Sequence, residues 1–186
     1  MKLWLVRHAQ PEVAPGTCYG QLDLPARAPD TERCAQALAT ALPINARLVH
    51  SPLRRCAELA MQLHGLRPDL SPAADDRLKE MHFGEWEGLL WQTIDPPSLK
   101  AWTDDFANHR VGGHGDSVTQ VMNRVAAAFD DLGRDLHGDT VWITHAGVIR
   151  AVELIARGQR HITRADAWPL AAPEYGQWFT LTLQPP

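Results

Sequence analysis

The sequence predicts an α/β protein built on a largely parallel sheet. Short apolar runs alternate along the chain with segments in which apolar residues recur every three or four positions, as expected of strands and helices in βαβ units. Arginines and histidines follow three of the apolar runs. The last segment, 174–183, alternates apolar and polar side chains, which is typical of a half-exposed strand at a sheet edge.

The size and charge of the chain limit its class and its partners. A length of 186 residues suits a single domain, 1–186, with a substantial core. The net charge is −4, and no run of lysine or arginine forms a basic stripe. We therefore expect neither nucleic acid nor an anionic membrane as a partner. An anion can still bind where a local cluster of cations receives it.

The sequence predicts a cytoplasmic protein. No apolar run reaches the ~20 residues that cross a bilayer, and Arg7 interrupts the first apolar run too early for a signal peptide. The three cysteines at positions 18, 34 and 56 show neither paired nor metal-binding spacing, which fits a reducing compartment.

The first strand is expected over Met1–Val6, which is mostly apolar and ends at Arg7-His8. The following segment, 9–29, is rich in proline and glycine, and a loop of this length is more often functional than a mere connection. Asp30 is a plausible N-cap for the next helix. One face of that helix carries apolar residues, and a proline stops it: Ala35, Leu38, Ala39, Leu42 and Pro43.

A second strand is expected over Ala46–His50. Ser51 as N-cap and Pro52 at the first helical position then predict a helix that ends at Gly65. Arg54 and Arg55 fall in its first turn, where free backbone N–H groups favour an anion. A third strand is expected over 69–71.

The middle of the chain predicts a short helix over 87–91 that Pro96-Pro97 closes, and another helix over 98–108. Ser117 and Gln120 form a capping-box pattern that opens the clearest helix, whose apolar stripe runs to Leu136. Thr140–Thr144 is a buried-type strand followed at once by His145, and a helical stripe then ends near Gly158.

Three predicted strands end in polar groups that suit an anion. If these strands are parallel neighbours, two arginines (Arg7 and either Arg54 or Arg55) and two histidines (His8 and His145) meet at one edge of the sheet, where open α/β sheets bind ligands. The planar guanidinium of arginine matches phosphate, and a neutral imidazole can attack phosphorus. The sequence therefore predicts phosphoryl transfer or hydrolysis. It has no Gly-x-x-x-x-Gly-Lys loop and no clear carboxylate cluster for magnesium, so we expect no metal and no cofactor.

The ordered motifs resemble the histidine phosphatase superfamily, also called the phosphoglycerate-mutase-like fold. The motifs are Val6-Arg7-His8-Ala9, Ser51-Pro52-Leu53-Arg54-Arg55-Cys56, Leu78-Lys79-Glu80, Phe83-Gly84-Glu85-Trp86-Glu87-Gly88, Gly115-Asp116-Ser117 and Thr144-His145-Ala146-Gly147. The resemblance implies a three-layer sandwich with helices on both faces of the sheet. Residues 16–25 look like the α-ribazole phosphatase branch, whose substrate is a phosphorylated intermediate of cobalamin assembly.

The resemblance implies a role for each matched position. His8 becomes the phosphohistidine, and Glu80 donates a proton to the leaving group, with Glu85 and Glu87 as competing carboxylates. Three further residues bind phosphate, namely Arg7, Arg55 and His145, and Arg54 falls at a variable position. Two residues of the early loop line the substrate side, namely Tyr19 and Gly20.

Three functions remain open at this point. The first is a phosphomonoesterase that acts on a small phosphate ester, with α-ribazole 5′-phosphate as one candidate. The second is a mutase, although mutases of this family usually carry longer insertions. The third is a non-catalytic phosphate-binding protein, which would need neither a nucleophile nor an acid. The sequence does not indicate the oligomeric state.

Overall fold

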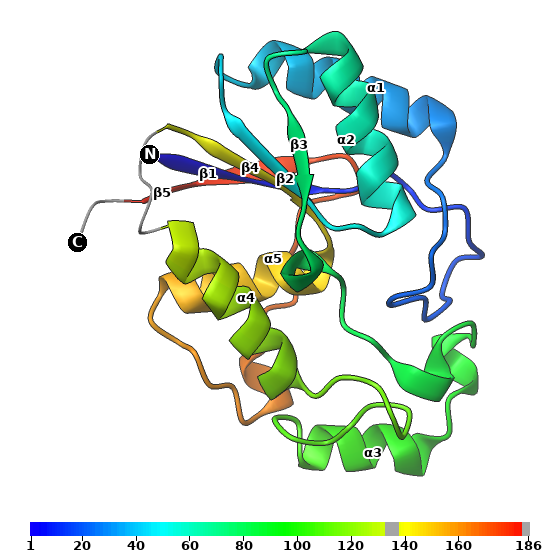
Figure 1. Cartoon of the computed structure of the whole chain (residues 1–186). Helices are drawn as coiled ribbons and strands as arrows, with labels where there is room; N and C mark the ends of the chain where they lie inside the picture. Colours follow the sequence, from blue (N-terminus) through cyan, green and yellow to red (C-terminus); the bar gives the residue numbers. More distant parts are fainter. Residues whose placement is uncertain (133–137, 184–186) are drawn as a thin grey trace.

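The protein is a three-layer α/β structure, described here by a computed structural model for residues 1–132 and 138–183 (Figure 1). Its sheet has five strands in the order β3-β2-β4-β1-β5. Only β5 runs antiparallel, beside β1 at one edge. The bounds of the strands are β1 Lys2–Arg7, β2 Arg47–His50, β3 Pro72–Ala74, β4 Thr140–Thr144 and β5 Trp178–Thr182.

Helices cover both faces of the sheet, as expected (Figure 1). Alternate residues of β1 enter separate cores, because successive side chains of a strand point to opposite faces. Leu3 and Leu5 pack with the helices α4 and α5, whereas Val6 packs with α1 and α2. The bounds of the helices are α1 Ala28–Ala41, α2 Arg54–Leu66, α3 Pro96–Asp104, α4 Val118–Leu132 and α5 Ala146–Ala156.

The helix starts expected at Asp30 and Ser51 are wrong. The first helix begins at Ala28, and its N-cap is Arg27. Ser51 instead extends the sheet, since its N–H donates to Ile143 O at 2.9 Å, and α2 starts three residues later with Leu53 as N-cap. The Ser51 hydroxyl accepts a hydrogen bond from Leu53 N at 3.3 Å and also contacts the candidate site.

The third strand lies three residues beyond the expected 69–71. Asp69 is held in a turn by paired hydrogen bonds from Arg67 at 2.7 Å, so pairing with β2 begins only at Pro72. No helix forms over 87–91; single 3₁₀ turns occur at Gly84–Trp86 and Trp91–Thr93.

Pro96 and Pro97 open α3 rather than close a helix, because proline suits the first helical turn. The capping box of α4 is confirmed: Ser117 N donates to Gln120 Oε1 at 2.8 Å, and Gln120 N donates to Ser117 Oγ at 3.2 Å. Leu136, predicted on the stripe of α4, lies outside the described residues. Within the described part of the chain, no helix is long and apolar enough to span a membrane.

Candidate active site

The strand order places β2, β4 and β1 side by side, so their carboxyl ends meet at one edge of the sheet. His8 follows β1, Arg55 lies in the first turn of α2 after β2, and His145 follows β4. The His8 and His145 rings are 5.1 Å apart, and Arg55 Nε lies 3.3 Å from His8 Nε2. Side chains far apart in the sequence are thus brought into one cluster.

The ring of His8 is held in one tautomer. Its Nδ1 lies 2.7 Å from the carbonyl oxygen of Ala9, which can only accept a hydrogen bond, so Nδ1 carries the proton. Nε2 therefore keeps its lone pair and accepts a hydrogen bond from Arg55 Nε. The atom that faces the arginine is the one that can act as a nucleophile.

The interior of the cluster keeps both imidazoles neutral. Burial, and then the positive charge of Arg55, hold the pKa of His8 and the pKa of His145 well below the ordinary value of 6.5. His145 Nε2 also lies 2.8 Å from Ser51 Oγ and 3.5 Å from Cys56 Sγ. A neutral ring at each position leaves the arginines as the charges that attract an anion.

Arg55 is fully buried and oriented by main-chain oxygens. Its Nη1 donates to Leu22 O at 2.8 Å, and its Nη2 donates to Gly20 O at 2.6 Å. Gly20 has a φ of +34°, and a Cβ at this position would lie 2.7 Å from Met81 O, so glycine is required here. Its neighbour Arg54 lies outside the cluster, where it is exposed and bonded to Glu58.

Arg7 lies at the same edge beneath a tyrosine. Its Nη1 donates to Pro173 O at 2.9 Å, and its Cζ lies 3.8 Å from the centre of the Tyr175 ring. Among the described residues, the buried Arg7 Nε has no hydrogen-bond partner. An anion placed beside His8 would supply an acceptor for this N–H.

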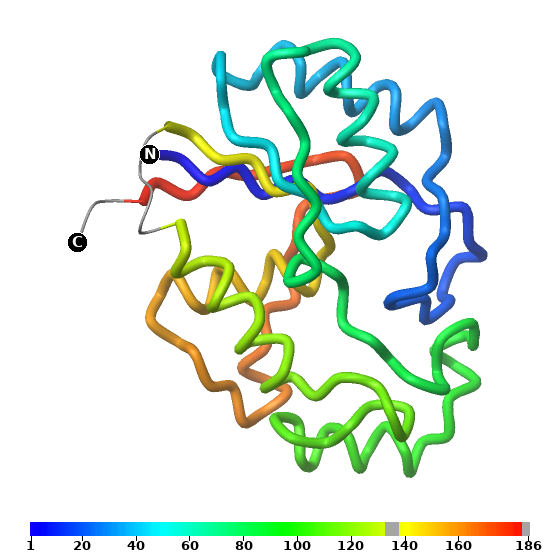
Figure 2. Tube along the Cα trace, in the orientation of Figure 1, coloured from blue at the N-terminus to red at the C-terminus, as the bar shows by residue number. Residues whose placement is uncertain are grey.

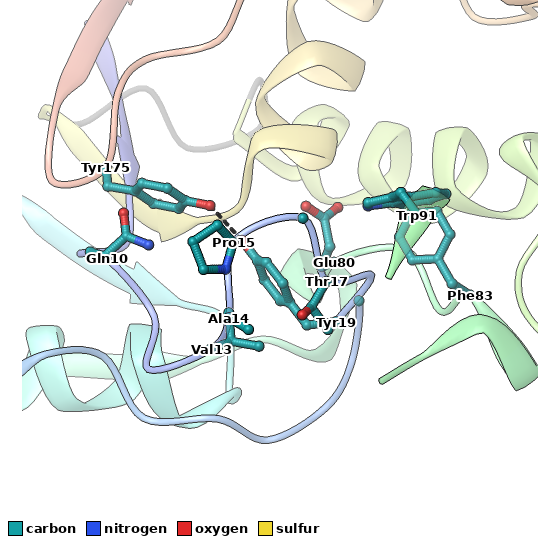
Figure 3. A pocket seen from close by; sticks show the side chains of 12 residues that line it. Gln10, Val13, Ala14, Pro15, Thr17, Tyr19, Glu80, Phe83, Trp91 and Tyr175 are labelled. Atoms are coloured by element: carbon teal, nitrogen blue, oxygen red, sulfur yellow. Dashed lines mark hydrogen bonds between the residues drawn. The ribbon is translucent and has the colours of Figure 1, made fainter. Parts of the chain in front are cut away.

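Tyr19 and Tyr175 line a cavity of about 310 Å³ (Figure 3). Their hydroxyls lie 3.0 Å apart, and their rings lie 6.5 and 5.5 Å from that of His8. His8 itself is only 1% exposed, so both tyrosine rings help to bury it.

Glu80 is the carboxylate that faces this cavity (Figure 3). Its Oε2 accepts a hydrogen bond from Gly147 N at 3.1 Å, and its Oε1 accepts one from Met81 N at 3.0 Å. The competing Glu87 accepts hydrogen bonds from the main-chain N–H groups of the loops, whereas Glu85 is exposed.

Arg124 holds the backbone that carries Glu80. It reaches across from α4, where its Nη1 donates to Arg77 O at 2.7 Å and Lys79 O at 2.6 Å, and its Nη2 donates to Glu80 O at 3.0 Å. These bonds fix the position from which the carboxylate enters the cavity.

Sequence reasoning missed Ser51, Cys56 and Tyr175 as site residues. The pairing of β5 with β1, which the sequence did not indicate, places Tyr175 at the site. In an antiparallel pair the start of one strand lies beside the end of the other, and Trp178 pairs with Val6. The residues just before β5 therefore lie next to Arg7 and His8.

Comparisons with known proteins agree with this geometry. A family model for the histidine phosphatase superfamily (branch 1) matches residues 3–175. Glucosyl-3-phosphoglycerate phosphatase of Mycolicibacterium vanbaalenii is 30% identical over 182 residues, 91% of this chain and 78% of that protein. Adenosylcobalamin/alpha-ribazole phosphatase of Salmonella typhimurium is 30% identical over 170 residues, 84% of this chain and 79% of that protein.

A solved structure shows the same likeness in three dimensions. It is that of a mycobacterial glucosyl-3-phosphoglycerate phosphatase in complex with inorganic phosphate. It matches with a TM-score of 0.79 and 26% identity, and the match covers 97% of this chain and 89% of that chain.

Proposed function

Since the chain belongs to the histidine phosphatase superfamily and is a phosphatase, we propose that it hydrolyses a small phosphate monoester through a phosphohistidine on His8. The observation that carries this proposal is the bond from His8 Nδ1 to Ala9 O, which leaves the Nε2 lone pair beside Arg55. A phosphate-binding protein would need the arginines but not an imidazole held in this tautomer.

In the first step, His8 Nε2 attacks phosphorus and a P–N bond forms. The P–O bond to the leaving group breaks, its electron pair moves to the bridging oxygen, and Glu80 gives that oxygen a proton. Two arginines and one imidazole, those of Arg7, Arg55 and His145, bind the phosphoryl oxygens while charge spreads over them.

In the second step, water attacks the phosphorus of the phosphohistidine and gives a proton to the Glu80 carboxylate. The P–N bond breaks and its electron pair returns to His8 Nε2. Inorganic phosphate leaves, and Glu80 is again protonated for the next cycle.

We propose α-ribazole 5′-phosphate as the physiological substrate. The similarity to an adenosylcobalamin/alpha-ribazole phosphatase and the residues 16–25 support this choice. A comparison of kcat/KM for α-ribazole 5′-phosphate and glucosyl-3-phosphoglycerate tests it, and a higher value for the latter would refute it.

The mechanism is tested by trapping ³²P from a labelled ester with an alkaline detergent quench, because the P–N bond of phosphohistidine is labile in acid. The wild-type protein should carry the label on a histidine, whereas His8→Ala should carry none and should not hydrolyse 4-nitrophenyl phosphate. Turnover that persists in His8→Ala overturns the mechanism. The adjacent arginines give a matched control, because Arg55→Ala should lose activity and the exposed Arg54→Ala should keep it.

A further inference from the structure

The candidate site contains two neutral imidazoles whose environments are alike. The rings of His8 and His145 lie 5.1 Å apart, and burial and the charge of Arg55 lower the pKa of both. A neutral imidazole can attack phosphorus with its bare nitrogen or donate a hydrogen bond from its protonated nitrogen. The position of the proton on each ring therefore decides which histidine performs which task. For His8, the carbonyl oxygen of Ala9 fixes that proton on Nδ1.

The sheet places Ser51 beside the second imidazole. Ser51 N donates to Ile143 O at 2.9 Å, which extends the pairing of β2 with β4 by one residue. In Figure 2 these strands run side by side, β2 in cyan and β4 in yellow, and His145 follows β4 directly. The rigid edge of the sheet, rather than a loop, thus sets the distance of 2.8 Å between Ser51 Oγ and His145 Nε2.

The hydrogen bonds around Ser51 Oγ indicate where its hydroxyl hydrogen points. Leu53 N donates to Oγ at 3.3 Å, so the hydroxyl accepts this bond and still has one hydrogen to donate. That hydrogen goes to His145 Nε2 at 2.8 Å, since the neighbouring sulfur of Cys56 is a weak acceptor. The reverse bond, from Nε2–H to Oγ, would leave the serine hydrogen with only this sulfur. The thiol hydrogen of Cys56 is itself directed to Thr144 O, 3.6 Å from Sγ.

A hydroxyl that donates to Nε2 places the proton of the neutral His145 ring on Nδ1. Among the described residues, the hydrogen-bond contact of Nδ1 is Cys56 Sγ, a weak acceptor at 4.0 Å. The N–H at Nδ1 is therefore available to an oxygen of the phosphoryl group. His8 then presents a lone pair to phosphorus, whereas His145 presents a hydrogen to the oxygens.

We infer that Ser51 is a positioning residue of the reaction, whose hydroxyl holds His145 in the tautomer that donates from Nδ1. This inference rests on the proposed function. Ser51 acts through His145 and does not itself bind the phosphoryl group. In the opposite tautomer, Nδ1 would turn a lone pair toward the phosphoryl oxygens, so the site would lose a donor and gain a repulsion. The same bond keeps His145 from presenting a second bare nitrogen to phosphorus.

Nitrogen NMR of the ¹⁵N-labelled wild-type protein tests the tautomer without a variant that must fold and act. Protonated and bare imidazole nitrogens have well separated ¹⁵N shifts. We expect His145 to show a protonated Nδ1 and a bare Nε2, and the loss of these signals in His145→Gln assigns them. Inorganic phosphate should then move the signal of the hydrogen on Nδ1 downfield. A bare Nδ1, or a signal that phosphate does not move, would overturn the inference.

Ser51→Ala tests the effect on the reaction. It should lower kcat/KM for ethyl phosphate and the affinity for inorganic phosphate by about 10- to 100-fold, the range for one lost hydrogen bond to a charged group. Its ¹⁵N spectrum should show that His145 is no longer confined to the Nδ1–H form. Full activity, or lost activity with the tautomer unchanged, would refute the role. Ser71→Ala is the matched control, because Ser71 is exposed before β3 and its loss should not change activity.

A double variant tests whether Ser51 acts through His145. In a His145→Ala background, Ser51→Ala should reduce phosphate affinity no further, because the ring that the hydroxyl holds is absent. An additive loss of affinity would mean that Ser51 acts on phosphate by another route, which contradicts the inference.

The inference and the proposed function can fail separately. A wild-type protein that traps label on His8 while His145 carries its proton on Nε2 keeps the function and loses the inference. A wild-type protein that traps no label on a histidine loses the proposed function and the inference that rests on it.

Discussion

Gly147→Ala should displace Glu80 without unfolding the protein. Gly147 lies in the first turn of α5 and donates its N–H to Glu80 Oε2 at 3.1 Å. A Cβ at Gly147 would overlap Oε1 and would lie 3.1 Å from Cδ of Glu80, so the carboxylate must move. The obstacle is the end of a flexible side chain rather than backbone, and the helix can therefore remain in place.

The expected loss of activity in Gly147→Ala follows from the distance by which the Glu80 carboxylate is displaced. Relief of the overlap moves the carboxylate by about 1 Å, and a misplacement of about 1 Å can cost roughly 100-fold in rate. We expect kcat/KM for ethyl phosphate to fall by about that factor, or about 2.7 kcal/mol of activation free energy. The free energy of unfolding should stay within about 1 kcal/mol of wild type, because alanine favours the helix while one hydrogen bond weakens.

The assay separates an effect on proton donation from general damage. Hydrolysis of 4-nitrophenyl phosphate should change only a few-fold, because its leaving group needs little protonation. Gly65→Ala in α2 is the matched control, since nothing lies within 4 Å of its added Cβ and activity should not change. In a Glu80→Gln background, Gly147→Ala should cost nothing further. Equal losses with both esters, or an additive loss in the double variant, would refute the reasoning.

Three further predictions concern the same region. Because His8 and His145 have a lowered pKa and the unfolded chain binds their protons near pH 6.5, the contribution of these two groups to the free energy of unfolding should be constant above that pH and fall below it; urea titrations that give equal stability at pH 7.5 and pH 5.5 would contradict this. Thr144→Val removes the hydroxyl that donates to Leu78 O at 2.7 Å and should cost about 1–3 kcal/mol by the same titration, and a loss near zero would show that Leu78 O finds another partner. Arg124→Lys should lower kcat/KM for ethyl phosphate more than for 4-nitrophenyl phosphate, and an equal effect on both would mean that Arg124 does not position Glu80.

The strands and the cluster at their ends could be predicted from sequence, since both depend on local patterns. An apolar run followed by Arg7-His8, and another followed by His145, indicate buried strands that end at a site. The order β2-β4-β1 brings these ends together as expected. The alternation over 174–183 likewise predicted the edge strand β5.

Helix starts and the walls of the cavities were decided by tertiary contacts. The sequence suggested a helix cap at Ser51. In the structure its N–H instead donates to Ile143 O of the sheet, and its hydroxyl lies 2.8 Å from His145 Nε2. Similarly, Pro96-Pro97 fits the end of one helix as well as the start of another, and only the capping bond from Ser98 N to Asp95 at 3.1 Å distinguishes them.

The sequence by itself determined the family and the chemical types at the ends of the strands, because each depends on motifs of residues close together in the chain. Only the tertiary structure decided which nitrogen of His8 is free, that Tyr175 covers Arg7, and that aromatic side chains from α3 and the segment before β5 form one cavity. The physical reason is that these features depend on side-chain contacts between segments far apart in sequence, and no local pattern specifies such contacts.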